Sequence, residues 1–340
     1  MLSILALIFP FFALVLCGYL AVRRHVLPQL AIPGLNIFVL YFALPCLLFR
    51  FGANSPIAQL LDPAVFCVYL LCALIMVGLT IALTLGRPAD WNNASFGALV
   101  AAFPNTGFMG VPLLIALLGP RSSATAIVTM AIDLIITSSL CVALSRLGDS
   151  PSSEGSGAAL RDALARMLRN PMPWSILLGV LAAGGGAELP APLDETIRLL
   201  SDAASPAALF TIGAVLARAH MSGAAAAPTA AGANGASANA ASANAASPIG
   251  AYLPVALLKL VVHPLLVYAT GSAAIALGVP LDPYALTVLV LVACLPSASN
   301  VAMLAERFGA DTGRIARIIL VSTALSFLTI TAAMALLAPG

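Results

Sequence analysis

The chain has 340 residues, of which 61% are hydrophobic and only 8% are charged, and its formal net charge is +2. A soluble globular protein carries about a quarter charged residues, so this composition excludes that class and predicts an integral membrane protein. The basic residues are scattered at the ends of apolar segments, and no nucleic-acid partner is expected.

Apolar segments follow one another along the whole chain, and each is close to the roughly twenty residues that cross a bilayer. We predict ten spans, at approximately 2–22, 31–50, 63–85, 96–118, 123–145, 171–187, 194–217, 251–278, 284–305 and 314–338. The first has no preceding basic region and no signal cleavage site, so it is predicted to be a span rather than a signal peptide.

The fourth and ninth spans are each interrupted by a proline beside small and polar residues, Phe103-Pro104-Asn105-Thr106-Gly107 and Leu295-Pro296-Ser297-Ala298-Ser299-Asn300. Proline cannot continue a helix cleanly, and in lipid the freed backbone groups must find partners inside the protein or in a wet cavity. A matched pair of broken spans is the sequence signature of a transporter's substrate site.

Arginine placement predicts the orientation of the spans. With the N-terminus outside, eleven arginines fall in cytoplasmic connections and three in external ones, namely Arg50, Arg121 and Arg198. Both termini are therefore expected on the periplasmic side.

Two connections are longer than the rest. Residues 146–170 contain a polar stretch and then a segment with leucines four apart, which predicts a short amphipathic helix on the cytoplasmic surface. Residues 222–248 are almost entirely Ala, Ser, Asn and Gly, which predicts a disordered linker.

Two motifs recur in the same order in both halves of the chain. Pro45-Cys-Leu-Leu-Phe49 is matched 161 residues later by Pro206-Ala-Ala-Leu-Phe210, and Pro104 is matched 192 residues later by Pro296. The excess of 31 residues is close to the length of the linker. The pattern predicts two five-span repeats of opposite orientation, 1–145 and 171–340, joined by residues 146–170.

Several of these segments resemble permeases of the auxin efflux carrier family. The resemblance lies in Asn36–Phe49, Asn170-Pro171, Pro206–Ala217, Pro296–Asn300 and Ala305-Glu-Arg-Phe-Gly309. It covers the chain apart from the two long connections and is similar to the bacterial branch, which includes proteins described as malonate or malate transporters. It implies an all-α fold like those of sodium/bile-acid symporters and sodium/proton antiporters, with a scaffold half, a transport half and two crossed broken helices. It also implies that Asn105 contacts the substrate carboxylate, and that the protein forms a homodimer.

Half-helix N-termini at such breaks present unpaired amides and positive dipole ends, which suit a carboxylate. The candidate substrate-binding residues are Pro45, Pro104, Asn105, Thr106, Pro296, Ser297, Ser299 and Asn300. The alternative is that these polar side chains only satisfy the broken backbone. Gly107 and Gly110 are expected to let the two backbones cross closely.

Ionisable residues inside spans are costly and therefore informative. Asp133, Lys259 and His263 are the candidates for ion coupling or charge compensation, with Lys259 and His263 on one helix face. The alternatives are that Lys259 snorkels to the cytoplasmic surface, while His263 bonds a backbone carbonyl. The six cysteines lie in apolar runs without metal-binding spacing.

The sequence carries no hydrolase, metalloprotease or phosphate-loop motif, so no enzyme and no cofactor or metal is expected. The leading prediction is a secondary carrier for a small carboxylate in the bacterial inner membrane, with coupling to H⁺ or Na⁺ left open. A cation/proton antiporter that uses Asp133 is the second hypothesis, and a non-transporting sensor or channel is the third.

Overall fold

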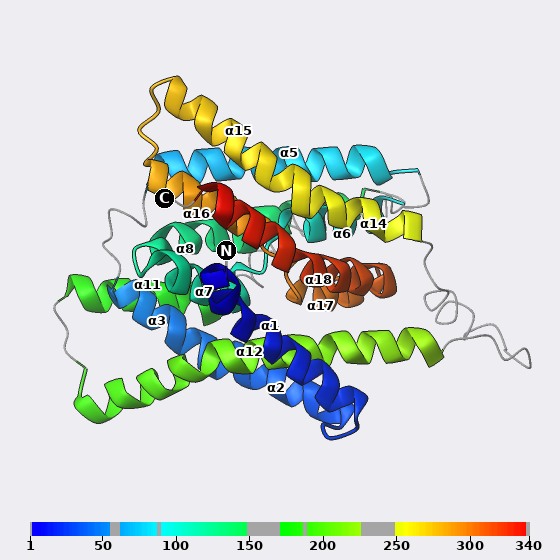
Figure 1. Cartoon of the computed structure of the whole chain (residues 1–340), viewed down its shortest axis with the longest axis horizontal. Coiled ribbons are helices and arrows are strands. Elements are labelled where there is room, and N and C mark those ends of the chain that lie inside the picture. Colours follow the sequence, from blue (N-terminus) through cyan, green and yellow to red (C-terminus); the bar gives the residue numbers. More distant parts are fainter. Residues whose placement is uncertain are drawn as a thin grey trace, which may run out of the picture.

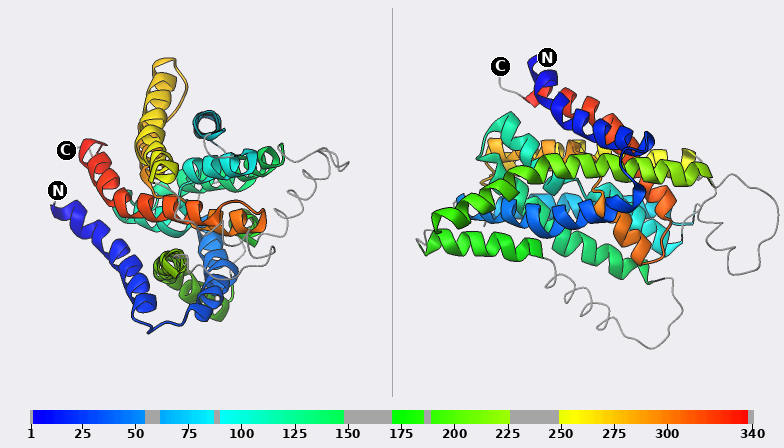
Figure 2. Two further views of the ribbon diagram at one scale, coloured as in Figure 1. Left: turned by 90° about the vertical axis from the view of Figure 1, so that its right-hand side faces the viewer. Right: turned by 90° about the horizontal axis from the view of Figure 1, so that it is seen from below.

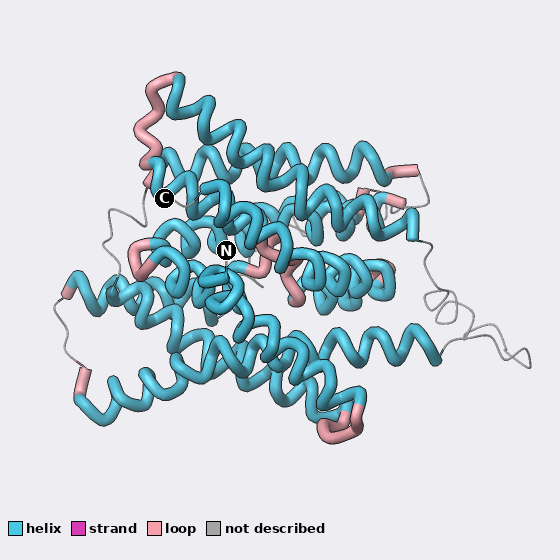
Figure 3. The backbone as a smooth tube through the Cα atoms, viewed as in Figure 1, coloured by secondary structure: helices cyan, strands magenta, loops and turns pink. Residues whose placement is uncertain are grey.

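The computed structural model describes residues 2–54, 62–86, 90–147, 171–185, 189–225 and 249–337. Helices make up nearly all of this part of the chain, joined by short turns (Figure 3). They gather into two groups that lie one above the other in Figure 1.

The first helix group contains the blue and green helices of Figure 1. Its members are α1 (Leu2–Arg23), η1 (Gln29–Ala31), α2 (Ile32–Phe38), η2 (Val39–Ala43), α3 (Leu44–Asn54), α11 (Pro171–Gly184) and α12 (Ala191–Ala225). Within it, α1 packs most extensively on α12, and α3 packs on both α11 and α12. Helices from the two ends of the sequence are thus neighbours.

The second helix group holds the main hydrophobic core. Its members are α5 (Pro63–Thr84), α6 (Trp91–Ala102), η3 (Thr106–Gly110), α7 (Val111–Leu118), α8 (Ser122–Ile132), η4 (Asp133–Thr137), α9 (Ser138–Ser145), α14 (Ile249–Leu257), η5 (Leu258–Val262), α15 (His263–Ala276), α16 (Pro283–Cys294), α17 (Asn300–Arg307) and α18 (Thr312–Leu337). In this group α6 and α16 are buried along almost their whole length, since the other helices surround them.

Six continuous helices in the described part of the chain are long and apolar enough to cross a membrane, and four shorter apolar helices accompany them. Large apolar side chains such as Leu71, Leu265 and Leu328 point outward and are about half exposed. An apolar outer surface is what a bilayer requires, and the protein is a multi-pass membrane protein. The N- and C-termini lie near each other in all three views (Figures 1 and 2).

Two helix pairs of the first group approach each other at glycines. A Cβ on Gly18 would collide with the backbone of Phe210, and one on Gly213 would collide with that of Val15. These contacts join α1 to α12.

The same contacts recur between α3 and α11. A Cβ on Gly179 would collide with the backbone of Phe49, and one on Gly52 would collide with that of Ile176. Each of these four residues is 161 positions from its counterpart in the α1–α12 pair. The offset first seen in the Pro-x-x-Leu-Phe motif therefore reappears as two equivalent packing interfaces.

Four short π-helical segments interrupt the longer helices: η2, η3, η4 and η5. Three of them end two residues before a proline, namely Pro45, Pro112 and Pro264. A proline ring clashes with the carbonyl four residues earlier, and a wider turn moves that carbonyl away. In the fourth, η4, the Ser138 hydroxyl instead bonds the Asp133 carbonyl at 2.7 Å.

One boundary differs from the sequence prediction. The predicted linker begins at residue 222, but α12 continues to Ala225, because its alanines sustain the helix beyond the apolar run. Its remainder, 226–248, and the predicted surface helix within 148–170 lie outside the described residues.

Candidate substrate site at two broken helices

Two helices of the second group stop and restart at the same place. The first, α6, ends at Ala102, and the chain is extended through Phe103 before η3 begins at Thr106. The second, α16, ends at Cys294, and α17 begins at Asn300. Both interruptions fall at the prolines identified in the sequence.

The two interruptions pair with each other. Pro104 and Ser297 form an isolated antiparallel bridge. The Asn105 amide donates to the Pro296 carbonyl at 2.8 Å, and the Ala298 amide donates to the Phe103 carbonyl at 3.0 Å. Backbone groups freed by the two prolines thereby find partners without water, as a buried break requires.

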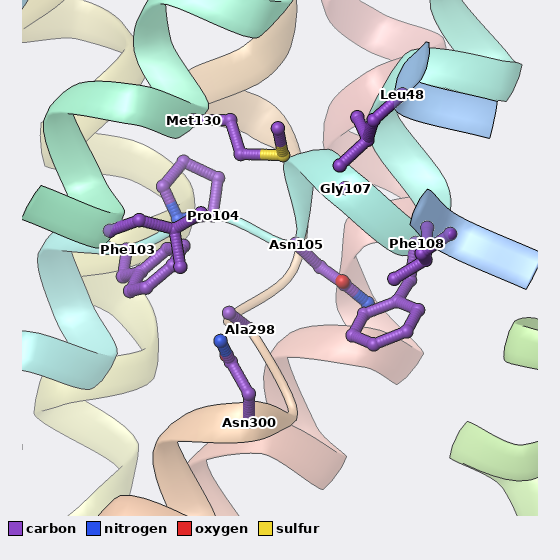
Figure 4. A pocket seen from close by; sticks show the side chains of 11 residues that line it. Leu48, Phe103, Pro104, Asn105, Gly107, Phe108, Met130, Ala298 and Asn300 are labelled. Atoms are coloured by element: carbon purple, nitrogen blue, oxygen red, sulfur yellow. The ribbon is translucent and has the colours of Figure 1, made fainter. Parts of the chain in front are cut away.

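A pocket opens beside this crossing, with about 340 Å³ of empty volume that includes its open mouth. It is lined by Leu44, Leu48, Phe103, Pro104, Asn105, Gly107, Phe108, Met130, Leu134, Ala298 and Asn300. Figure 4 shows Asn105 and Asn300 on the two broken segments, with Leu48 and Phe108 on the same side of the view as Asn105. Because Leu44 and Leu48 come from α3, the pocket lies between the two helix groups.

Several buried polar atoms at the crossing have no hydrogen-bond partner in the protein. They are Asn105 Oδ1, Thr106 Oγ1, Ser297 Oγ and Asn300 Oδ1. A buried polar atom left unpaired is costly, so such a cluster indicates a site that a ligand or water completes. An asparagine amide offers a donor and an acceptor that exchange on a half-turn, and hydroxyls do either.

The helix ends add an electrostatic preference to this pocket. The N-terminal ends of η3 and α17 begin at the pocket residues Asn105 and Asn300. Helix N-termini carry partial positive charge and favour anions. No basic side chain is among the described residues that line the pocket.

The structure separates the predicted substrate-binding residues into two sets. Pro104, Asn105 and Asn300 line the pocket. Pro45, Thr106, Pro296, Ser297 and Ser299 belong to the two broken segments or to α3, but they do not line it.

Ser297 has a structural contact of its own. Its backbone amide donates to Ser322 Oγ of α18 at 3.1 Å. For this residue the backbone-capping alternative has a defined partner.

Glycine lets the two broken segments approach. A Cβ on Gly110 would lie 2.5 Å from Leu295 Cδ1, and one on Gly107 would lie 3.2 Å from Met130 Sδ. Gly110 is thus required where η3 meets the residue that ends α16.

The three ionisable candidates lie in a buried cluster beside the crossing, on η4, η5 and α15. The Tyr69 hydroxyl donates to Asp133 Oδ2 at 2.7 Å, and the Thr137 hydroxyl donates to Oδ1 at 3.1 Å. The Tyr69 and His263 ring centroids are 6.3 Å apart. Lys259 Nζ lies 3.1 Å from His263 Nδ1 and donates to the Ala293 carbonyl at 2.8 Å.

The snorkelling alternative for Lys259 is wrong. Its side chain is fully buried, because the wide turn of η5 and the carbonyl of Ala293 hold the ammonium inside the second helix group. The expected carbonyl partner of His263 is replaced by Lys259.

Sequence reasoning missed the apolar wall of the pocket and the partners of Asp133. Leu44 and Leu48 belong to the motif around Pro45, which pointed to this helix without indicating which side chains face inward. Tyr69 sits in a uniformly apolar span, where no pattern distinguishes it.

Comparison with known proteins places the chain in a family. The Membrane transport protein family matches residues 3–334. A protein of Rhizobium meliloti (strain 1021) named "Putative malonate transporter" is 31% identical over 349 residues, covering 100% of this chain and 98% of that protein. The "Uncharacterized transporter YfdV" of Escherichia coli (strain K12) is 26% identical over 216 residues, covering 61% of this chain and 67% of its own length.

A family match over nearly the whole chain and relatives named as transporters agree with the absence of enzyme motifs in the sequence. The chain therefore belongs to the membrane transport protein family of the auxin efflux carriers, and it is a non-enzymatic permease.

Proposed function

We propose that this permease is a secondary active transporter for a small organic anion, a mono- or dicarboxylate such as malonate or malate. The observation that carries the proposal is the pocket at the crossing, where Asn105 and Asn300 meet two helix N-termini. A carboxylate fits donors and positive dipole ends, and the name of the Rhizobium meliloti relative agrees with this chemistry.

The proposed architecture is ten spans in two inverted five-helix repeats within the bacterial inner membrane, both termini periplasmic. The equivalent glycine interfaces of α1–α12 and α3–α11 support it, because exchange of the halves maps one interface onto the other. The crossing supports it too, since its two backbone hydrogen bonds exchange in the same way. Alternating access then follows from motion of the second helix group against the first.

The pocket also predicts a preference within this substrate class. Asn105 and Asn300 can hold one carboxylate, while the remaining wall is formed by apolar side chains such as Leu48, Phe108 and Met130. A second full negative charge against that wall lacks a partner, so we expect monoanions to bind more tightly than dianions.

The cation/proton antiporter is the competing function. Asp133 is the residue it needs, but Asp133 is outside the pocket lining and both of its carboxylate oxygens accept hydroxyl hydrogen bonds. The crossing also offers no second carboxylate among the described residues that line the pocket.

Uptake into proteoliposomes tests the proposal. Labelled malonate, malate and an indole acid are each offered to the purified protein, with pH and Na⁺ gradients set independently. We expect saturable carboxylate flux that unlabelled carboxylates compete. No flux of any carboxylate, together with H⁺/Na⁺ exchange in the same vesicles, would establish the antiporter instead.

A further inference from the structure

The buried ammonium of Lys259 has a defined place in the fold. Ammonium carries three donors and no acceptor. One donor goes to the Ala293 carbonyl and another to His263 Nδ1. Because Nδ1 must accept, the neutral His263 ring carries its proton on Nε2, which has no partner in the protein.

Ala293 lies in the last turn of α16, one residue before the helix ends at Cys294. The last carbonyls of a helix have no partner within it and carry partial negative charge, which favours a cation. At the same helix end, the Thr329 hydroxyl of α18 donates to the Cys294 carbonyl at 3.3 Å. Lys259 therefore occupies the position beside a broken helix where a freely diffusing cation would bind in other transporters.

The charge of Lys259 is balanced within the same cluster. Asp133 is also fully buried, and its partner Tyr69 packs against His263. One buried carboxylate and one buried ammonium make the cluster neutral, which removes most of the cost of burying either alone. Among the residues described, no group of three or more His, Cys, Asp or Glu side chains is placed to hold a metal ion.

We propose that Lys259 is a resident counter-cation: its ammonium fills the cation position at the carbonyl end of α16 permanently, and the carrier works without bound Na⁺. The consequence for flux rests on the proposed transport function. The occupancy of the position by an ammonium does not, and can be tested separately.

Chemical rescue tests the occupancy. Lys259→Ala removes three methylene groups and the ammonium, so propylammonium matches the missing atoms and 1-propanol is its uncharged counterpart. We expect Lys259→Ala to lower the Tm of the detergent-purified protein, and propylammonium to restore about 2–4 °C of it while 1-propanol does not. The matched control is Leu260→Ala, which empties a neighbouring buried position without removing a charge.

A rise in Tm with propylammonium that is equal for Lys259→Ala and Leu260→Ala overturns the proposal. If Lys259→Ala cannot be purified, Lys259→Met is compared with Lys259→Met/Asp133→Asn. Charge balance requires the double variant to unfold at a higher temperature than the single one, and a double variant that unfolds at the same or a lower temperature contradicts it.

The ion dependence of wild-type flux is the second readout. We expect equal carboxylate uptake in sodium, potassium and choline chloride. A tenfold or greater loss when Na⁺ is withdrawn overturns the proposal. Absence of uptake in all three salts refutes the transport function instead, and the rescue experiment then still decides whether Lys259 fills a cation position.

Discussion

At the scale of single residues, the pocket divides its work between amides and apolar side chains. Asn105 and Asn300 supply the hydrogen-bonding groups, whereas Phe108 and Leu48 set the width of the space beside them. Polar groups fix the orientation of a ligand and apolar walls select its size. Substitutions in these two sets are therefore expected to change different properties.

Phe108→Ala removes a ring from the pocket wall. We expect the apparent affinity for an indole acid to rise and that for malonate to fall, each by roughly tenfold, because a small anion loses contacts that a larger one regains. The measurement is competition by both compounds in an uptake assay. Phe66→Ala, on the exposed face of α5, is the control and is expected to change neither. Equal loss for both anions would show that Phe108 does not set the width of the site.

At the scale of helices, the two equivalent glycine interfaces hold the first helix group together. The atoms that a Cβ would meet at Gly213 and Gly52 belong to the backbones of Val15 and Ile176. Backbone cannot move aside as a flexible side chain can, so the helices must separate. Close small-residue contacts of this kind are typical of helix packing in membranes.

Gly213→Ala and Gly52→Ala are each expected to destabilise the protein by about 1–3 kcal/mol, by similar amounts because the interfaces are equivalent. Gly78→Ala in α5 is the control, since nothing lies within 4 Å of the added Cβ. There the gain in helix propensity is expected to stabilise by about 0.5–1 kcal/mol. Thermal unfolding in detergent measures all three. A large difference between Gly213→Ala and Gly52→Ala would contradict the equivalence of the two interfaces.

Much of this arrangement can be predicted from the sequence because it follows from strong local signals. Pro104 and Pro296 mark the breaks, since a proline within an apolar span removes a hydrogen bond that lipid cannot replace. The 161-residue offset of the Pro-x-x-Leu-Phe motif predicts a repeat, and Phe49 and Phe210 of that motif are themselves interface residues.

The rest depends on tertiary packing. Pro45 is preceded by a π-helical segment, but Pro206, its counterpart 161 residues later, lies inside the uninterrupted helix α12. Lys259 is close enough in sequence to a cytoplasmic connection for snorkelling to be reasonable. Only the position of Ala293 on another helix shows where its ammonium goes.

At the scale of the whole molecule, the pocket lies where the two helix groups meet. Leu44 and Leu48 come from the first group, and the broken helices come from the second. Phe12 of α1 and Phe327 of α18 meet across the same boundary, edge to face, with ring centroids 5.2 Å apart. Transport by relative motion of the groups must change contacts such as this one.

A short bifunctional thiol reagent between Phe12→Cys and Phe327→Cys, in a variant without native cysteines, is expected to stop uptake. The unlinked protein is expected to retain it. Linking Arg121→Cys to Asp282→Cys is the control, because this exposed pair joins two parts of the second group. Uptake that continues at the unlinked rate in the Phe12–Phe327 cross-linked protein would rule out motion between the groups at this boundary.

The most direct test of the central claim is carboxylate uptake by Asn105→Ala in proteoliposomes. Loss of a hydrogen bond to a charged ligand costs about 1.5–3 kcal/mol, so uptake at low substrate concentration is expected to fall about 10–100-fold. The control is Asn92→Ala, which removes an asparagine that bonds the Phe308 carbonyl away from the pocket. It is expected to transport like the wild type. Near wild-type uptake by a folded Asn105→Ala protein would contradict a substrate site at the crossing of the broken helices.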